Sequence, residues 1–346
     1  MKKKLMALSA LGGISGFEFS VTEEVEKLFK TYCDEVETDK MGNVVGVIRS
    51  PKKNAGRVML EAHVDVIGLM VSSISEDGFL SFQPIGGVDS AVLPGAEVIV
   101  CGTEELFGVI GAKPPHLQTG KQSAAKMEDM VIDIGLSGEK VRQKVSVGDM
   151  VYFAEKPAAL SGKVLSGRGF DDRAGIVSLL ICLEKLKGTN LPFDLYVVAA
   201  VQEEPGLRGA TMVTERLAPD CACVVDVCHG DTPDAGSDSI FKLGSGAVIS
   251  FGPNIHPYLA KLATEVAKQE KIDFSPDADG GDTGTDAWAV QIAAEGVPVL
   301  LLSIPLRYMH TTVETLHFDD VKAVGSLLCE TLKKLDLEVL GCTFQN

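Results

Sequence analysis

The sequence LYVVAAVQEEPG, residues 195–206, predicts a buried strand that ends on two carboxylates. Every residue from Leu195 to Val201 is apolar or aromatic, which is typical of a strand covered on both faces of a parallel sheet. Glu203 and Glu204 follow, and Pro205 favours an extended conformation at Glu204. Because ligands of open α/β sheets bind at the carboxyl ends of strands, both glutamates are candidate functional residues.

Other side chains of the metal-binding type stand at the ends of apolar runs or beside turns: His63, Asp65, Asp171, Asp226 and His310. Each has an ordinary explanation by itself, since a histidine can be hydrogen-bonded at a strand end and an aspartate can cap a helix. Asp171 and Asp172 could also divide the work, one capping a helix and the other reaching into a cleft. Such residues on so many consecutive elements are hard to explain by chance, and they suit a two-metal hydrolytic site.

Their spacing suggests separate roles. Residues two apart in an extended chain lie on one face, so Asp65 could fix the tautomer of His63 while the other ring nitrogen binds a metal. Adjacent extended residues face opposite ways. Of Glu203 and Glu204, one could therefore coordinate a metal and the other take a proton from metal-bound water, although a solvated pair of charges in a turn is the alternative.

Helix and strand patterns alternate after Gly167, which predicts an α/β sheet with both faces covered. The predicted helices cover residues 21–32, 174–186, 257–270, 287–294 and 318–335. The predicted strands cover residues 43–48, 58–62, 195–201, 221–227 and 297–304. The two ends of the chain, residues 1–66 and 160–346, are therefore predicted to form one α/β domain.

Residues 67–159 are predicted to form a small all-β domain inserted into the first. Short β-like runs recur there, separated by glycine, proline and charged turns: Leu69–Ile74, Leu80–Phe82, Glu97–Cys101, Leu106–Ile110, Met130–Ile134 and Met150–Phe153. A length of 346 residues is consistent with two domains.

Charge and hydropathy limit the partners. The formal net charge of −16 repels phosphates, so neither nucleic acid nor an anionic membrane is an expected partner. No apolar run is long enough to predict a transmembrane helix. Lys2, Lys3 and Lys4 precede a short apolar stretch as in a secretory signal, but near-helical leucine spacing and Gly12-Gly13 favour a short opening helix instead.

The eight cysteines contain no C-x-x-C pair and are spread along the chain, which favours reduced thiols in a cytoplasmic protein. Cys221 and Cys223 could chelate a metal, but a strand would bury both on the same face as small apolar side chains.

The chain resembles the glutamyl and tetrahedral aminopeptidases, a family of dinuclear metallopeptidases whose members are also described as endoglucanases. The resemblance extends along the whole chain. It is carried by GISGFE (13–18), AHVD (62–65), KPPH (113–116), DDR (171–173), QEE (202–204), GTDA (284–287) and IPLRYMH (304–310).

The resemblance implies a mixed-sheet α/β metallopeptidase domain with an inserted barrel-like dimerisation domain. It implies two divalent metal ions per subunit, the first bound by His63, Asp171 and Asp226, and the second by Asp171, Glu204 and His310. Glu203 would be the general base for a water held by both metals, and Asp65 would support His63. The implied activity is release of N-terminal residues from peptides, by a homo-oligomer such as a tetrahedral dodecamer built from dimers.

The ligand set of histidine and carboxylate suits zinc, with cobalt or manganese as alternatives. Pro205 stands where the family has an aliphatic residue, which affects the expected position of Glu204. His229 could line the site, whereas His116, His256 and His317 are interpreted as structural.

Three alternatives to the aminopeptidase remain. Another two-metal amide hydrolase, such as a deacylase or carboxypeptidase, shares the same chemistry. An endoglucanase would use two carboxylates but would usually need aromatic sugar platforms, and Trp288 is the only tryptophan. A non-catalytic metal-binding scaffold would not need Glu203.

Overall fold

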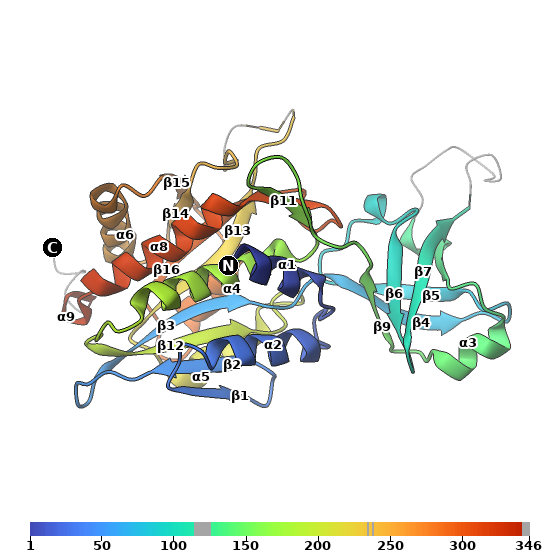
Figure 1. The fold of residues 1–346 in the computed structure, drawn as a ribbon, viewed down its shortest axis with the longest axis horizontal. Coiled ribbons are helices and arrows are strands. Elements are labelled where there is room, and N and C mark those ends of the chain that lie inside the picture. Colours follow the sequence, from blue (N-terminus) through green and yellow to red (C-terminus); the bar gives the residue numbers. More distant parts are fainter. Residues whose placement is uncertain (114–125, 234, 237–238, 341–346) are drawn as a thin grey trace.

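The computed structural model describes residues 1–113, 126–233, 235–236 and 239–340. These residues form a large mixed sheet with helices on both faces and a separate closed barrel of antiparallel strands (Figure 1). The predicted fold class, a mixed α/β protein with a small all-β barrel-like part, is confirmed. No helix in the described part of the chain is long and apolar enough to cross a membrane.

The large sheet comprises, within the described residues, β1 (Glu35–Thr38), β2 (Val44–Ile48), β3 (Gly56–His63), β10 (Ala158–Ala159), β11 (Val164–Gly167), β12 (Phe193–Ala200), β13 (Cys221–His229), β14 (Ala247–Phe251), β15 (Phe274–Ala278), β16 (Val299–Arg307) and β17 (Glu314–His317). Its centre is parallel, because β12, β3, β13 and β16 pair side by side in the same direction. Antiparallel strands β2 and β14 flank this centre. The parallel centre is the part of the sheet that the long apolar runs predict.

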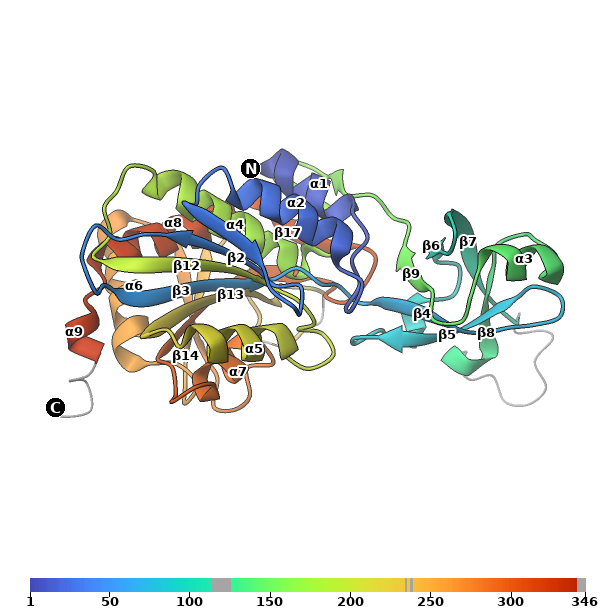
Figure 2. The same ribbon diagram turned by 90° about the horizontal axis from the view of Figure 1, so that it is seen from below.

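Helices cover both faces of the sheet (Figure 2). One face carries α1 (Lys2–Ala10), α2 (Phe19–Phe29), α4 (Phe170–Leu186) and α8 (Phe318–Lys334), with α6 (Pro257–Glu270) packed on α8 and β14 and α9 (Leu337–Leu340) following α8. The other face carries α5 (Arg208–Leu217) and α7 (Asp286–Ile292). The opening helix predicted from the leucine spacing is present as α1.

Side chains alternate between the two faces, as period-2 geometry requires. Leu60 of β3 packs in the core beneath α4 and α8, whereas its neighbour Met59 packs beneath α5 and α7. Cys221 and Cys223 of β13 are both buried on the α4 side, as the sequence predicts, and both are free thiols.

The barrel stands apart from the sheet and consists of β4 (Gly68–Ile74), β5 (Leu80–Ile85), β6 (Glu97–Cys101), β7 (Glu105–Ala112), β8 (Met130–Asp133) and β9 (Met150–Phe153). Each of the six predicted β-like runs overlaps one of these strands. A short helix, α3 (Gly138–Lys144), packs beside β4. The domain boundaries at 66/67 and 159/160 stay a prediction.

Arg173 ties the N-terminal segment to the sheet. Its fully buried guanidinium donates hydrogen bonds to the carbonyl oxygen of Val64 and to carbonyl oxygens within residues 8–12. Because buried carbonyls without a donor are costly, Arg173→Met should lower the free energy of unfolding by about 3 kcal/mol. Urea denaturation tests this, with exposed Arg142→Met expected to cost less than about 1 kcal/mol. Equal losses for the two variants would contradict the assignment.

Candidate functional site

The predicted site residues converge at the carboxyl end of the parallel strands. A cavity of about 440 Å³ is lined there by six of them: His63, Asp171, Glu203, Glu204, Asp226 and His310. The side chains come from the end of β3, the start of α4, the turn after β12, the strand β13 and the turn after β16. The remaining residue, Asp65, is fully buried and hydrogen-bonded to the backbone of the Glu203-Glu204 turn.

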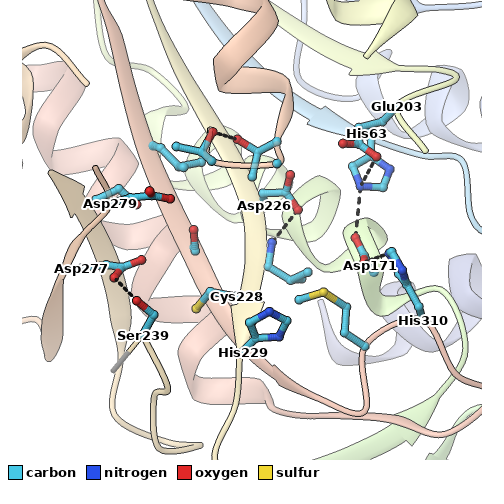
Figure 3. A pocket seen from close by; sticks show the side chains of 18 of the residues that line it. His63, Asp171, Glu203, Asp226, Cys228, His229, Ser239, Asp277, Asp279 and His310 are labelled. Atoms are coloured by element: carbon cyan, nitrogen blue, oxygen red, sulfur yellow. Dashed lines mark hydrogen bonds and ion pairs between the residues drawn. The ribbon is translucent and has the colours of Figure 1, made fainter. Parts of the chain in front are cut away.

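Asp171 lies between His63 and His310 (Figure 3). Its Oδ1 is 3.1 Å from Nε2 of His63, and its Oδ2 is 3.3 Å from Nε2 of His310. The two carboxylate oxygens therefore face different partners. This is the arrangement that a bridging carboxylate requires, so Asp171 is the natural centre of the site.

The donor atoms fall into two clusters. Asp171, Glu204 and His310 form one, which coincides with one of the ligand sets implied by the resemblance. The other consists of His63, Asp226 and Asp172. This cluster contains Asp172, whereas the ligand set implied by the resemblance contains Asp171. Asp171 also contacts His63.

Asp172 has a second task at the start of α4. Its Oδ1 accepts a hydrogen bond from the backbone N–H of Gly175 at 3.0 Å, while its buried Oδ2 has no partner within the described residues. Asp171 reaches into the cavity instead. Asp172 thus caps the start of α4, whereas Asp171 lines the cavity. Because each oxygen of Asp171 faces one histidine, we keep Asp171 as the residue common to both predicted ligand sets.

Glu203 and Glu204 have different neighbours, but not because they face opposite sides of a strand, and that prediction is wrong. The chain does not continue as a strand after β12, because Gln202 has φ of +56° and begins a turn. Both carboxylates consequently line the same cavity. The Glu203 Oε2 lies 4.0 Å from Nε2 of His63, whereas the Glu204 Oε2 lies 3.4 Å from Nε2 of His310.

Asp65 anchors the turn that carries the two glutamates. Its carboxylate accepts hydrogen bonds from the backbone N–H groups of Glu203 and Glu204 at 3.0 and 3.2 Å, and from Oγ of Ser15 at 2.6 Å. Nδ1 of His63 is 3.1 Å from the Asp65 carbonyl oxygen and 3.5 Å from its Oδ1. The nearest Asp65 atom to the ring nitrogen is thus its backbone carbonyl oxygen, while its carboxylate mainly positions the turn. The predicted support of His63 by the carboxylate stays a prediction.

Several further residues of the site were not singled out from the sequence. Glu314 is buried and accepts hydrogen bonds from the backbone N–H groups of Phe170, Asp171 and His310, which joins the two turns that carry ligand candidates. The segment that follows β5 also reaches the site, because a Cβ at Gly87 would lie 2.7 Å from Nδ1 of His310. A larger residue at position 87 would require the imidazole to shift.

A second pair of carboxyl groups, Glu61 and Asp286, is buried beside the site. Glu61 precedes His63 by two residues on the same face of β3. The side chains of Glu61 and Asp286 are both almost fully shielded from solvent. Burial raises the pKa of each carboxyl well above its usual value.

Several carboxyl groups of the site are buried close together, which makes their ionised forms unfavourable. Burial raises the pKa of Glu203 to about 9 and that of Asp226 to about 7, and it raises the pKa of Glu204 well above its usual value. Burial acts in the same direction on Asp171, but hydrogen bonds to His310 and His63 outweigh it and hold the pKa of Asp171 well below its usual value. A bound cation would stabilise the ionised form of every one of these carboxylates.

The remaining histidines divide as follows. His229 lines the cavity. His256 and His317 stand at the N-cap positions of α6 and α8 and are absent from the cavity wall. His116, with most of the KPPH motif, lies outside the described residues.

Comparison with known proteins identifies the family of the chain. Residues 42–327 match the model of the M42 glutamyl aminopeptidase family. The chain belongs to the M42 family. It is accordingly a peptide hydrolase of an aminopeptidase family, and its described residues include groups able to hold a metal.

Individual M42-type relatives resemble the chain along nearly its whole length. A lysyl aminopeptidase of Pyrococcus furiosus is 36% identical over 335 residues, which cover 94% of this chain and 95% of the relative. The structure of an aminopeptidase from Desulfurococcus kamchatkensis superposes with a TM-score of 0.92 at 34% identity, covering 98% of this chain and 96% of that one.

Two further solved structures bear on assembly and on the alternatives. The TET1 peptidase of Pyrococcus horikoshii, which can assemble into a tetrahedron or a large octahedral shell, has a TM-score of 0.85 at 32% identity, with 96% of this chain and 99% of that chain covered. A Thermotoga maritima protein named an endoglucanase has a TM-score of 0.78 at 29% identity, with 97% and 99% covered.

Proposed function

We propose that the chain is a metal-dependent aminopeptidase that releases N-terminal residues from peptides by means of a centre built around Asp171. The observation that carries this proposal is the position of Asp171 between His63 and His310, with the Glu203 carboxylate beside the same cavity. Membership of the M42 family supports the peptidase part of the proposal.

The residues present fit two divalent cations. His63, Asp171 and Asp226 would hold the first, and Asp171, Glu204 and His310 the second. The donor atoms are imidazole nitrogens and carboxylate oxygens, which suits zinc and also accommodates cobalt or manganese. The buried Oδ2 of Asp172 has no hydrogen-bond partner in the described part of the chain, and the pKa values of the buried carboxyl groups Glu204 and Asp226 are raised. Both observations are consistent with a site that needs a cation.

Divalent ions bound here would supply Lewis acidity, making a water more acidic and polarising the scissile carbonyl. The chain itself would move the proton. Glu203 lies at the cavity wall without being needed as a ligand, so its carboxylate can take a proton from the attacking water and pass it to the leaving amine. A hydrogen bond from its backbone N–H to the Asp65 carboxylate holds Glu203 in place.

The first experiment is a panel of aminoacyl-p-nitroanilides tested with the zinc-, cobalt- and manganese-loaded protein. Release of nitroaniline from free aminoacyl substrates supports the proposal. Preferential release of an acyl group or of a C-terminal residue would favour the deacylase or carboxypeptidase alternative. Release of reducing sugar from cellulose at a comparable rate would favour the endoglucanase, and cleavage of no peptide would favour the scaffold.

Chelation should remove both activity and stability. Without cations the buried carboxylates of the site lack compensating charge, and a ligand that binds only the folded state stabilises it by mass action. We expect two metal ions per chain by elemental analysis, and we expect EDTA to lower the thermal midpoint by several degrees. One ion or none in fully loaded, active protein would contradict the two-metal proposal.

The barrel is proposed to mediate homo-oligomer formation. Phe107 and Val109 of β7 and Val147 are exposed on the barrel, although large apolar side chains are usually covered. The shells formed by the Pyrococcus horikoshii relative support assembly, up to a tetrahedral dodecamer built from dimers. Light scattering at micromolar concentration should give a mass well above that of one chain, and a monomer would refute this proposal.

We also propose a cytoplasmic location, because free cysteines spread along a chain are typical of proteins in a reducing compartment. The described cysteines are all free.

A further inference from the structure

The cavity has a second acidic end, remote from the proposed metal ligands. Asp277 and Asp279 line it there, on the side opposite His63 and His310 (Figure 3). Within the described residues, no lysine or arginine lines the cavity. This end therefore offers negative charge that no side chain of the cavity wall balances.

Strand register connects the two ends. Asp226 of β13 pairs with Ser303 of β16, Ser303 pairs with Val248 of β14, and Ser250 of β14 pairs with Asp277 of β15. Paired residues share a face of the sheet, and so do Val248 and Ser250, which are two residues apart on β14. Asp226, Ser303, Ser250 and Asp277 therefore lie on one face of the sheet, which extends from a proposed metal ligand to the acidic end. Three strand spacings separate β13 from β15, or about 14 Å.

Two hydroxyl groups on this face have no hydrogen-bond partner among the described residues. Ser250 and Ser303 are only 2% and 3% exposed and both line the cavity, yet neither side chain makes a hydrogen bond to any described residue. Buried polar groups are normally hydrogen-bonded, so these hydroxyls point to a ligand or to water held in the cavity.

The cavity wall also contains apolar side chains. Leu301 and Met309 line the cavity and could contact the methylene groups of a long side chain. Asp277 already accepts a hydrogen bond from Oγ of Ser239 at 3.3 Å, which fixes its orientation. The wall thus combines an apolar stretch with a terminal pair of carboxylates.

We propose that this end of the cavity receives the side chain of the substrate's N-terminal residue and selects lysine or arginine. This inference rests on the proposed aminopeptidase function. The long aliphatic stem would lie along the apolar wall, and the cationic head would reach Asp277 and Asp279. Burial and the nearby charge of Asp279 raise the pKa of Asp277, a cost that a bound cation relieves. A glutamate side chain would be repelled instead.

The test compares lysyl, norleucyl and glutamyl p-nitroanilides with the metal-loaded protein. Norleucine keeps the aliphatic stem of lysine and lacks the charge. We expect kcat/KM to be at least about tenfold higher for the lysyl than for the norleucyl substrate, because a charge-assisted hydrogen bond distinguishes them, and lowest for the glutamyl substrate. The double variant Asp277→Asn, Asp279→Asn should reduce the lysyl-to-norleucyl ratio about tenfold or more. Asp273→Asn, an exposed residue beside the other end of β15, should keep the ratio.

Calorimetry provides a readout that does not depend on turnover. Lysinamide should bind to the metal-loaded Glu203→Gln protein about tenfold more tightly than norleucinamide, and the Asp277/Asp279 double substitution should remove this preference. Equal binding of the two amides, or faster cleavage of the norleucyl or glutamyl substrate, would overturn the inference and leave the aminopeptidase proposal intact. Cleavage of none of the substrates would overturn the aminopeptidase proposal itself.

Discussion

Glu203→Gln should retain both metal ions and lose catalysis by about 10²- to 10⁴-fold in kcat, the range that removal of a general base typically costs. The amide is nearly isosteric with the carboxylate but cannot accept the proton of the attacking water. Because Glu203 is assigned to the water and not to an ion, elemental analysis should show an unchanged metal content. Steady-state kinetics with an aminoacyl-p-nitroanilide measures the loss.

The neighbouring residue provides the matched control. Glu204→Gln should weaken the metal site shared with His310, since an amide is a poorer ligand than a carboxylate, and added metal should restore part of the activity. If the Glu203 variant loses metal while the Glu204 variant keeps both ions and is inactive, the two roles are reversed.

Asp171→Asn should remove both ions together and reduce activity to the level of the chelated protein. The Oδ1 and Oδ2 atoms of Asp171 face His63 and His310 separately, so one substitution disturbs both proposed ligand sets. Asparagine keeps one acceptor oxygen and replaces the other with an amide nitrogen that cannot serve as a ligand.

Asp172→Asn is the adjacent control for this variant. Asp172 belongs to only one donor cluster and already accepts a hydrogen bond from Gly175, so its amide variant should lose no more than one ion. Metal content after gel filtration distinguishes the two variants. Retention of both ions by Asp171→Asn would contradict the bridging assignment.

The centre of the fold was predictable because its strands are buried on both faces. Continuous apolar runs such as Leu195–Val201 identify parallel strands directly, and six short runs identify the barrel. Strands β1, β10, β11, β14, β15 and β17 and helices α3, α5 and α9 escaped prediction. Each is short or partly exposed. Strand β15 also carries Asp277 and a proline, and its position depends on pairing with β14, which no local pattern indicates.

The candidate site was predictable where a reactive side chain ends an apolar strand. His63 ends β3, whereas Asp226 follows an apolar run but lies inside β13, which continues to His229. Six of the seven predicted residues line one cavity. The supporting contacts were less accessible. Ser15 reaches Asp65 across fifty positions and Glu314 reaches Phe170 across 144, so only the folded chain shows these pairs. The turn at Gln202 likewise invalidated the argument from opposite strand faces.

Cleavage of a peptide with a free amino terminus, compared with its N-acetylated form, tests the central claim most directly. The metal-loaded protein is predicted to release the N-terminal residue of the free peptide, to leave the acetylated peptide intact, and to lose activity on chelation and regain it with added metal. Internal cleavage of the acetylated peptide, or full activity in protein shown by elemental analysis to be free of metal, would contradict the account.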